Sequence, residues 1–211
     1  MRKFAFAAAI AIVLVARGAS ADSYPLDDLD RVPPPKPKKL VCSPKDLVAY
    51  AGKLVRFDSA AQVSPLFVPR LERFEAIVRD VGTEVYGRPP RVLHQLGGFA
   101  CNTTPRGWIS EHAFGNALDV DGFTFPALAK GDAPDVPSKL RGSIRVRVGE
   151  AWTERAPAEE KRFFRLLLER LRATTDPFRG SLTDRVTPAA GHATHVHLDA
   201  GPFLVRRFEA P

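Results

Sequence analysis

Histidine and aspartate residues are concentrated in two short segments of the chain. Of the five histidines among 211 residues, His192, His195 and His197 lie together near the C-terminus. A fourth, His112, precedes Asp119 by seven residues. Imidazole and carboxylate groups are ligands of catalytic zinc, which takes three protein ligands and keeps one position open. We therefore expect the two segments to meet around one metal ion.

Both segments alternate polar and apolar side chains, as strands with one buried face do. The polar positions are Asp119 and Asp121 in the first segment, and His195, His197 and Asp199 in the second. If the two strands are neighbours, these side chains converge on one patch, which is costly to bury without a metal or a hydrogen-bond network. Spacing alone leaves open whether His195 or His197 is the third ligand. The isolated His94 is interpreted as structural.

The surrounding sequence predicts the elements that position these groups. Apolar residues recur at spacings of three and four from Leu66 to Val85, with Gly87 ending this helix, and again from Pro157 to about Thr175. Strands are expected at 53–57, 91–96, 117–125, 143–148 and 195–200, with irregular stretches at 126–142 and 176–190. Two helices and mostly non-local strands indicate an α+β domain with helices packed on an antiparallel sheet.

The N-terminus has the organisation of a secretory signal peptide, expected to span residues 1–21. The basic residues Arg2 and Lys3 precede thirteen apolar residues, 4–16, and a site of small residues ends at Ala21. A membrane anchor is the alternative, but thirteen residues are too few to cross about 30 Å as a helix. We predict an exported protein of the periplasm or cell envelope, with no membrane span in the mature chain.

Residues 22–40 are polar and proline-rich and predict an extended linker, which leaves 41–211 as one domain. The formal net charge is +7 and falls by three when the signal peptide is removed. A small positive surplus suits an anionic polymer such as a cell wall. Nucleic acid is not an expected partner, because no basic run is interleaved with aromatic residues. The domain is expected to be monomeric.

Cys42 and Cys101 are the only cysteines in the chain. In an exported protein such a pair is expected to form a disulfide. Closing a loop of about sixty residues would stabilise the fold by about 4 kcal/mol in the chain-entropy model. The bridge would also brace the loop that leads to His112. The alternative of a catalytic Cys–His pair is disfavoured, because an oxidised Cys101 is not a nucleophile.

The motifs resemble those of known zinc peptidases. Ser110-x-His112-x6-Asp119 followed by His195-x-His197 resembles the signature of the lysostaphin, D-Ala-D-Ala metallopeptidase and hedgehog superfamily. The segments 99–101, 109–123 and 195–199 are more closely similar to the bacterial extensin-like C-terminal domain family. The spacing of His192, His195 and His197 is also similar to that of penicillin-insensitive murein endopeptidases. The resemblance implies a hedgehog/D-Ala-D-Ala-peptidase-like fold.

The resemblance also implies roles for individual residues. The zinc ligands would be His112, Asp119 and His197. His195 would be the catalytic histidine, and His192 an auxiliary group that orients or stabilises charge. Ser110 would help to hold a substrate carboxylate. Relatives usually carry an arginine after the cysteine, where this chain has Asn102, and Arg106 would take over anion recognition.

The implied function is hydrolysis of amide bonds in the cross-links or stem peptides of peptidoglycan, through a zinc-bound water. Zinc lowers the pKa of water and polarises a carbonyl, and His195 would take the proton or stabilise the oxyanion. The dipeptidase branch of the superfamily has a glutamate where this chain has Thr194, so a general base would be a histidine or Glu111. The alternatives are a non-catalytic zinc-containing domain that binds or supports the wall, and a metal-free structural domain.

Overall fold

The computed structural model of the chain describes residues 42, 46–104, 109–173, 178, 180–183, 192–201 and 205–208. For 180–183 and 205–208 only the backbone is described. The predicted signal peptide, the linker 22–40 and Arg106 lie outside these residues. Within them, no helix has the length and apolarity that a membrane crossing requires.

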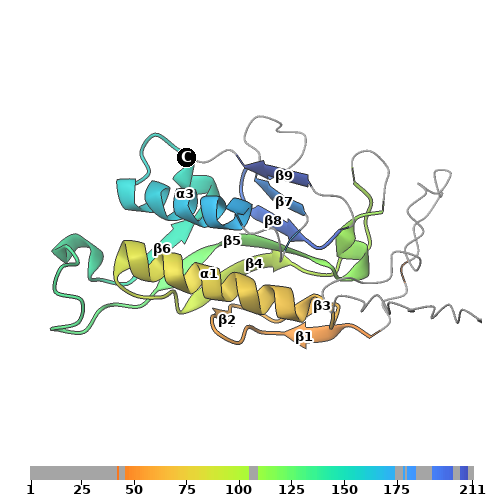
Figure 1. Cartoon of the computed structure of the whole chain (residues 1–211), viewed down its shortest axis with the longest axis horizontal. Coiled ribbons are helices and arrows are strands. Elements are labelled where there is room, and N and C mark those ends of the chain that lie inside the picture. Colours follow the sequence, from red (N-terminus) through yellow and green to blue (C-terminus); the bar gives the residue numbers. More distant parts are fainter. Residues whose placement is uncertain are drawn as a thin grey trace, which may run out of the picture.

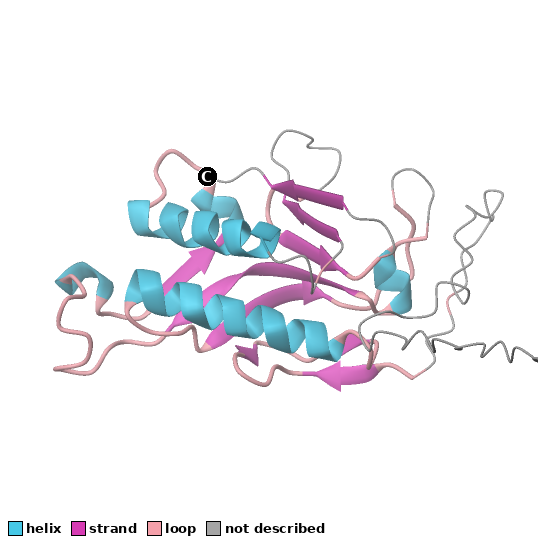
Figure 2. Ribbon diagram, in the orientation of Figure 1, coloured by secondary structure: helices cyan, strands magenta, loops and turns pink. Residues whose placement is uncertain are grey.

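Two long helices, α1 (Val68–Tyr86) and α3 (Ala158–Ala173), lie side by side on one face of a β-sheet (Figures 1 and 2). Pro69 sits in the first turn of α1, and Gly87 ends the helix with a φ of 68° in the left-handed region. The apolar stripes of both helices face the sheet and form one core with it. The two helices lie where the 3.6-residue periodicity predicted them.

Within the described residues, three shorter helices connect the larger elements. They are η2 (Glu111–Phe114), η3 (Ser138–Leu140) and α2 (Val148–Ala151). Val148 and Ala151 of α2 belong to the core, so α2 lies on the same side of the sheet as the long helices. The η2 helix is the turn that precedes Asp119.

The described strands form two sheets. The larger contains β2 (Arg56–Phe57), β4 (Val92–Gly97), β5 (Ala117–Phe125), β6 (Ile144–Arg147), β7 (Gly180–Thr183), β8 (Val196–Asp199) and β9 (Val205–Phe208), and the smaller pairs β1 (Val48–Tyr50) with β3 (Ala61–Val63). The order in the larger sheet is β2-β4-β5-β8-β7-β9, with β6 also beside β5. Among the described strands, only the pairs β2–β4 and β7–β9 are parallel. The protein is therefore an α+β domain with a mostly antiparallel sheet and packed helices.

The prediction of an irregular stretch over 176–190 is wrong for 180–183, which form β7 between β8 and β9. This short segment, like β9, lacks the clear polar–apolar alternation that marks a half-buried strand. The strand expected over 53–57 is reduced to Arg56–Phe57, because the preceding residues form a loop.

A β-bulge at Asp121 divides β5 into two halves. Neighbouring residues of β4 pair with Val120 and Gly122, so Asp121 is the extra residue. The apolar residues of both halves therefore face the core although their parity along the chain differs: Leu118 and Val120 before the bulge, Phe123 and Phe125 after it. Gly122 allows β6 to approach, because a Cβ there would lie 2.1 Å from the carbonyl oxygen of Val146. The first half pairs with β8 and the second with β6.

Candidate metal centre

His112, Asp119 and His197 meet on the face of the sheet opposite α1 and α3. His112 comes from η2, Asp119 from β5 and His197 from β8. Asp119 and His197 are direct cross-strand partners, with Leu118 and Leu198 paired beside them in the core. One ligand atom from each of the three polar residues lies within 4.8 Å of the others. The antiparallel pairing of β5 and β8 thus joins the two segments, as predicted.

The donor atoms of this group have the spacing of metal ligands. His112 Nε2 lies 3.2 Å from His197 Nδ1. The two oxygens of Asp119 complete the group, with Oδ2 at 3.3 Å from His112 Nε2 and Oδ1 at 2.8 Å from His197 Nδ1. Ligands at about 2.0–2.2 Å from a tetrahedral ion would be about 3.4 Å apart. Two imidazoles and one carboxylate at these distances fit a metal ion.

The backbone fixes the orientation of His112. Its Nδ1 lies within hydrogen-bond distance of the carbonyl oxygen of Gly98, which can only accept, so Nδ1 carries the proton. Nε2 is left with a lone pair that faces Asp119 and His197. This arrangement, in which the other ring nitrogen donates to a carbonyl, is typical of metal-ligating histidines. The side chain of His112 is 9% exposed, which further restricts its position.

Asp199 orients His197 in the same manner. Its Oδ2 lies 3.0 Å from His197 Nε2, and its Oδ1 accepts a hydrogen bond of 2.8 Å from the backbone N–H of Gly201. A proton on Nε2 leaves Nδ1 as the ligand atom toward Asp119. Burial alone would lower the pKa of His197, but hydrogen bonds with Asp119 and Asp199 outweigh burial and raise this pKa to about 10. In the metal-free chain His197 is therefore protonated on both ring nitrogens at pH 7, and a metal ion would displace the proton of Nδ1 while Asp199 keeps that of Nε2. Burial opposes ionisation of Asp119 too, yet the neighbouring His197 and His112 outweigh burial and hold the pKa of Asp119 below its usual range.

The two histidines predicted to be catalytic adjoin this group without belonging to it. His195 Nε2 lies 3.5 Å from Asp119 Oδ1. Burial lowers the pKa of His195 although the charge of Asp119 opposes the change, so a neutral imidazole is favoured at pH 7. The ring of His192 lies with its centre 5.3 Å from that of His195 and 5.4 Å from that of His197. His195 thus lies beside Asp119, and His192 lies beside His195 and His197.

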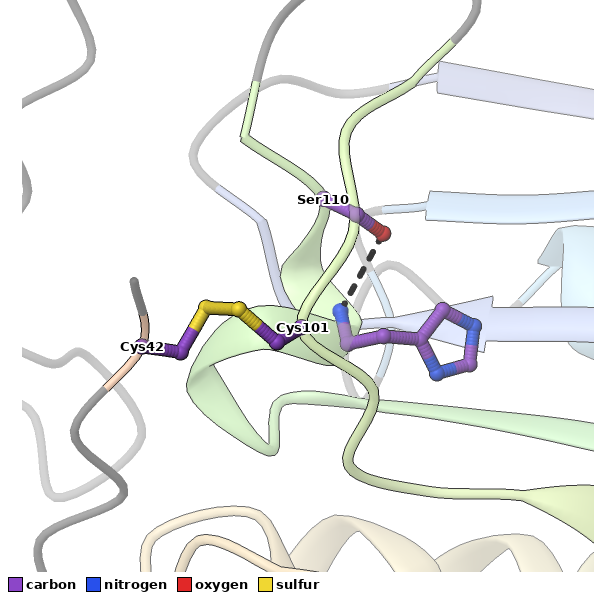
Figure 3. Close-up of a disulfide and its surroundings, with 4 residues drawn as sticks. Cys42, Cys101 and Ser110 are labelled. Carbon is purple, nitrogen blue, oxygen red and sulfur yellow. Dashed lines mark hydrogen bonds between the residues drawn. A yellow bond between two sulfur atoms is a disulfide. The ribbon is translucent and has the colours of Figure 1, made fainter. Parts of the chain in front are cut away.

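Ser110 supports the centre through the backbone. It is the N-cap of η2, and its Oγ accepts a hydrogen bond of 3.3 Å from the backbone N–H of His112 (Figure 3). Gly115, with a φ of 69°, ends the same helix. The capping contact fixes the turn that presents His112. The proposed contact of Ser110 with a substrate carboxylate stays a prediction.

Cys42 and Cys101 form a disulfide, with a Cα–Cα distance of 5.7 Å (Figure 3). The bridge ties the segment before β1 to the loop that precedes η2. In that loop, the backbone N–H of Ala100 donates to the carbonyl oxygen of His112 at 3.1 Å. The disulfide therefore braces the approach to the centre, and it fits a protein of an oxidising compartment.

Two other polar residues of the predicted strands lie outside the ligand group. His94 is held between Asp58 Oδ2, 3.0 Å from Nδ1, and Thr124 Oγ1, 2.7 Å from Nε2, which agrees with its interpretation as structural. Asp121 lies beside two arginines of β6, Arg145 and Arg147, each with a guanidinium nitrogen 3.7 Å from Oδ2. These arginines were not among the predicted site residues. Their alternation in the segment 143–148 placed them on one strand face, but the sequence did not reveal which strand lies beside them.

Comparison with known proteins places this site in a family. No match was found among curated proteins or among solved structures. The family model described as Extensin-like protein C-terminus matches residues 27–207, which include every residue of the metal centre. Because the match covers most of the sequence, the chain belongs to the extensin-like C-terminal domain family.

Proposed function

We propose that the protein is an exported zinc peptidase that hydrolyses amide bonds in the cross-links or stem peptides of peptidoglycan. The observation that carries this proposal is the group of His112, Asp119 and His197 with His195 beside it. Two imidazoles and one carboxylate leave one position open on a tetrahedral zinc ion, which is the arrangement of a catalytic rather than a structural site. The two residues that orient the ligands, Gly98 and Asp199, support the same assignment.

The residues around the centre would divide the chemistry of amide hydrolysis among them. A zinc ion held there would polarise the scissile carbonyl and increase the acidity of water. His195, whose Nε2 faces Asp119, would accept the proton of the attacking water at that nitrogen and donate it to the leaving amine. His192, whose ring lies beside that of His195, would be an auxiliary group that orients His195 or stabilises charge. Asp199 would hold the proton of His197 on Nε2 throughout.

The same proposal extends to the fold relationship and the location. The motif spacing and the antiparallel sheet with packed helices support a place in the lysostaphin, D-Ala-D-Ala metallopeptidase and hedgehog superfamily. A signal peptide over 1–21 and a linker over 22–40 would bring a monomeric domain, residues 41–211, to the periplasm or cell envelope. The disulfide supports this location.

A second candidate function is a non-catalytic zinc domain that binds or supports the wall. Asn102 replaces the arginine that relatives usually carry after the cysteine, and Thr194 stands where the dipeptidase branch has a glutamate. Both departures remove groups that a peptidase would use. The presence of His195 at 3.5 Å from the ligand Asp119 favours the enzyme.

Metal content and muropeptide release by the purified chain distinguish the two functions. We expect His112→Ala to lose both zinc and activity, and His195→Ala to keep zinc and lose turnover. His94→Ala, which changes a histidine outside the group, should change neither. Stoichiometric zinc without release from any wall would refute the peptidase and leave the second candidate. A wild-type chain that binds no zinc would refute both.

A further inference from the structure

Arg145 and Arg147 lie on the same face of the sheet as the metal centre. The residue between them, Val146, is 1% exposed and belongs to the core under the helices. The two arginines therefore project from the opposite face, on which Asp119 and Asp121 lie. Their side chains are 48% and 43% exposed, which leaves both accessible to a ligand.

Neither guanidinium makes a hydrogen bond with the part of the chain that the structure describes. Both lie 3.7 Å from the same oxygen of Asp121, and Arg147 is 3.6 Å from the exposed Glu150. These distances exceed those of N–H···O hydrogen bonds. Arg147 Nε, which faces Asp121, is buried, so the exposed part of this side chain that a ligand can reach is the outer part of the guanidinium. The charge of Asp121 thus holds both arginines near one point, while their outer guanidinium nitrogens form no hydrogen bond with the described residues.

The pairing of β5 with β6 and β8 defines how far the backbone of these arginines lies from that of the metal centre. His197 of β8 pairs with Asp119, and Arg147 of β6 pairs with Gly122 three residues further along β5. At about 3.3 Å per residue, less the shortening at the bulge, the backbone of Arg147 lies about 7–10 Å along the sheet from that of His197, and Arg145, which pairs with Thr124, lies two residues further along β5. An extended peptide covers that distance with two or three residues.

We propose that Arg145 and Arg147 bind a carboxylate of the peptide substrate, two or three residues from the bond that is cleaved at the metal centre. This inference rests on the proposed peptidase function and adds a specificity site to it. Arginine presents a planar fork of donors that matches a carboxylate. The pair would supply the anion recognition for which Asn102 offers no cation.

The test measures peptide binding without hydrolysis. The metal-free full chain is titrated by NMR with an extended stem-type tetrapeptide that ends in a free carboxylate, and with the same peptide ending in an amide. We expect the wild type to bind the carboxylate form at least about tenfold more tightly than the amide. Arg145→Gln/Arg147→Gln should lose this preference, and Arg145→Lys/Arg147→Lys should keep part of it, because charge remains without the fork.

The matched control is Arg162→Gln/Arg170→Gln, which removes the same charge from α3, where both arginines pair with Glu84. This control should keep the preference for the carboxylate. Equal binding of the two peptides by the wild type, or an unchanged preference in Arg145→Gln/Arg147→Gln, would overturn the inference even if the enzyme hydrolyses walls. A preference that depends on the two β6 arginines would support it even if no wall is hydrolysed, in which case only the proposed peptidase function fails.

Discussion

Replacement of Asp199 by asparagine tests whether a hydrogen bond selects the ligand atom of His197. The two oxygens of Asp199 accept from two donors, His197 Nε2 at 3.0 Å and the N–H of Gly201 at 2.8 Å. Asparagine has one acceptor oxygen, so its NH₂ group must face one of these donors. If the oxygen stays on Gly201, the amide N–H requires an acceptor at Nε2. A neutral His197 then carries its proton on Nδ1, the atom that faces Asp119, and this nitrogen cannot bind a metal ion.

The expected result is a large loss of metal affinity in a folded protein. Loss of a group that orients a metal-ligating histidine typically lowers affinity by about 10- to 100-fold. This range corresponds to about 1.4–2.7 kcal/mol of binding free energy. The estimate applies to Asp199 because its side chain is only 14% exposed, so water does not readily replace it.

Competition with a chelating dye at fixed pH and ionic strength measures the zinc affinity of wild type and Asp199→Asn. The matched control is Asp121→Asn, the same chemical change on a neighbouring strand, at a side chain that contacts Arg145 and Arg147 but no ligand. We expect the control to bind zinc as the wild type does. Wild-type affinity in Asp199→Asn would refute the role of the hydrogen bond. Thermal unfolding of the metal-free proteins checks that both variants fold.

Three predictions concern stability, measured by urea unfolding. Burial raises the pKa of Glu160, so the protonated carboxyl stabilises the fold at low pH and this contribution is lost as the carboxyl ionises. The free energy of unfolding of Glu160→Gln should therefore rise relative to that of the wild type from about pH 4 to pH 7, and parallel pH profiles would contradict this. Glu75 is fully buried and accepts hydrogen bonds from three consecutive backbone N–H groups, so Glu75→Gln should lower the free energy of unfolding by about 2–3 kcal/mol. Glu72 is partly exposed, and Glu72→Gln should lower it by less than about 1 kcal/mol. Cys42→Ser/Cys101→Ser should cost about 4 kcal/mol, and reduction should destabilise only the wild type.

The elements that were predicted correctly are those whose signal is local. Both long helices follow the 3.6-residue periodicity, and β5 occupies 117–125 as expected. Alternation also predicted that Leu118 and Val196 face the core while Asp119 and His197 face away from it. The proximity of these two strands did not follow from either segment alone. It required the motif resemblance or the structure.

The features that were not predicted depend on contacts between distant segments. Glu75 stands among the polar residues of an amphipathic helix, yet it is buried by the loop at residues 53–55 that its carboxylate binds. The orientation of His112 depends on the carbonyl of Gly98, and a backbone carbonyl has no signature in the sequence. The capping of η2 by Ser110 is by contrast a local contact with His112, and the predicted contact of Ser110 with a substrate carboxylate stays a prediction. The roles of Glu75 and His112 are thus set by where a distant backbone segment lies.

The bulge in β5 had a signal in the sequence, and it links the metal centre to the arginine pair. Strict alternation from Asp119 would put Phe123 and Phe125 on the metal face, where two aromatic rings would lose the core contacts they make with α1 and α3. One extra residue at Asp121 restores them to the core. The same bulge leaves the first half of β5 to β8 and the second half to β6. One strand can therefore present Asp119 of the candidate metal centre at one end and, through β6, two cations at the other, on a single face.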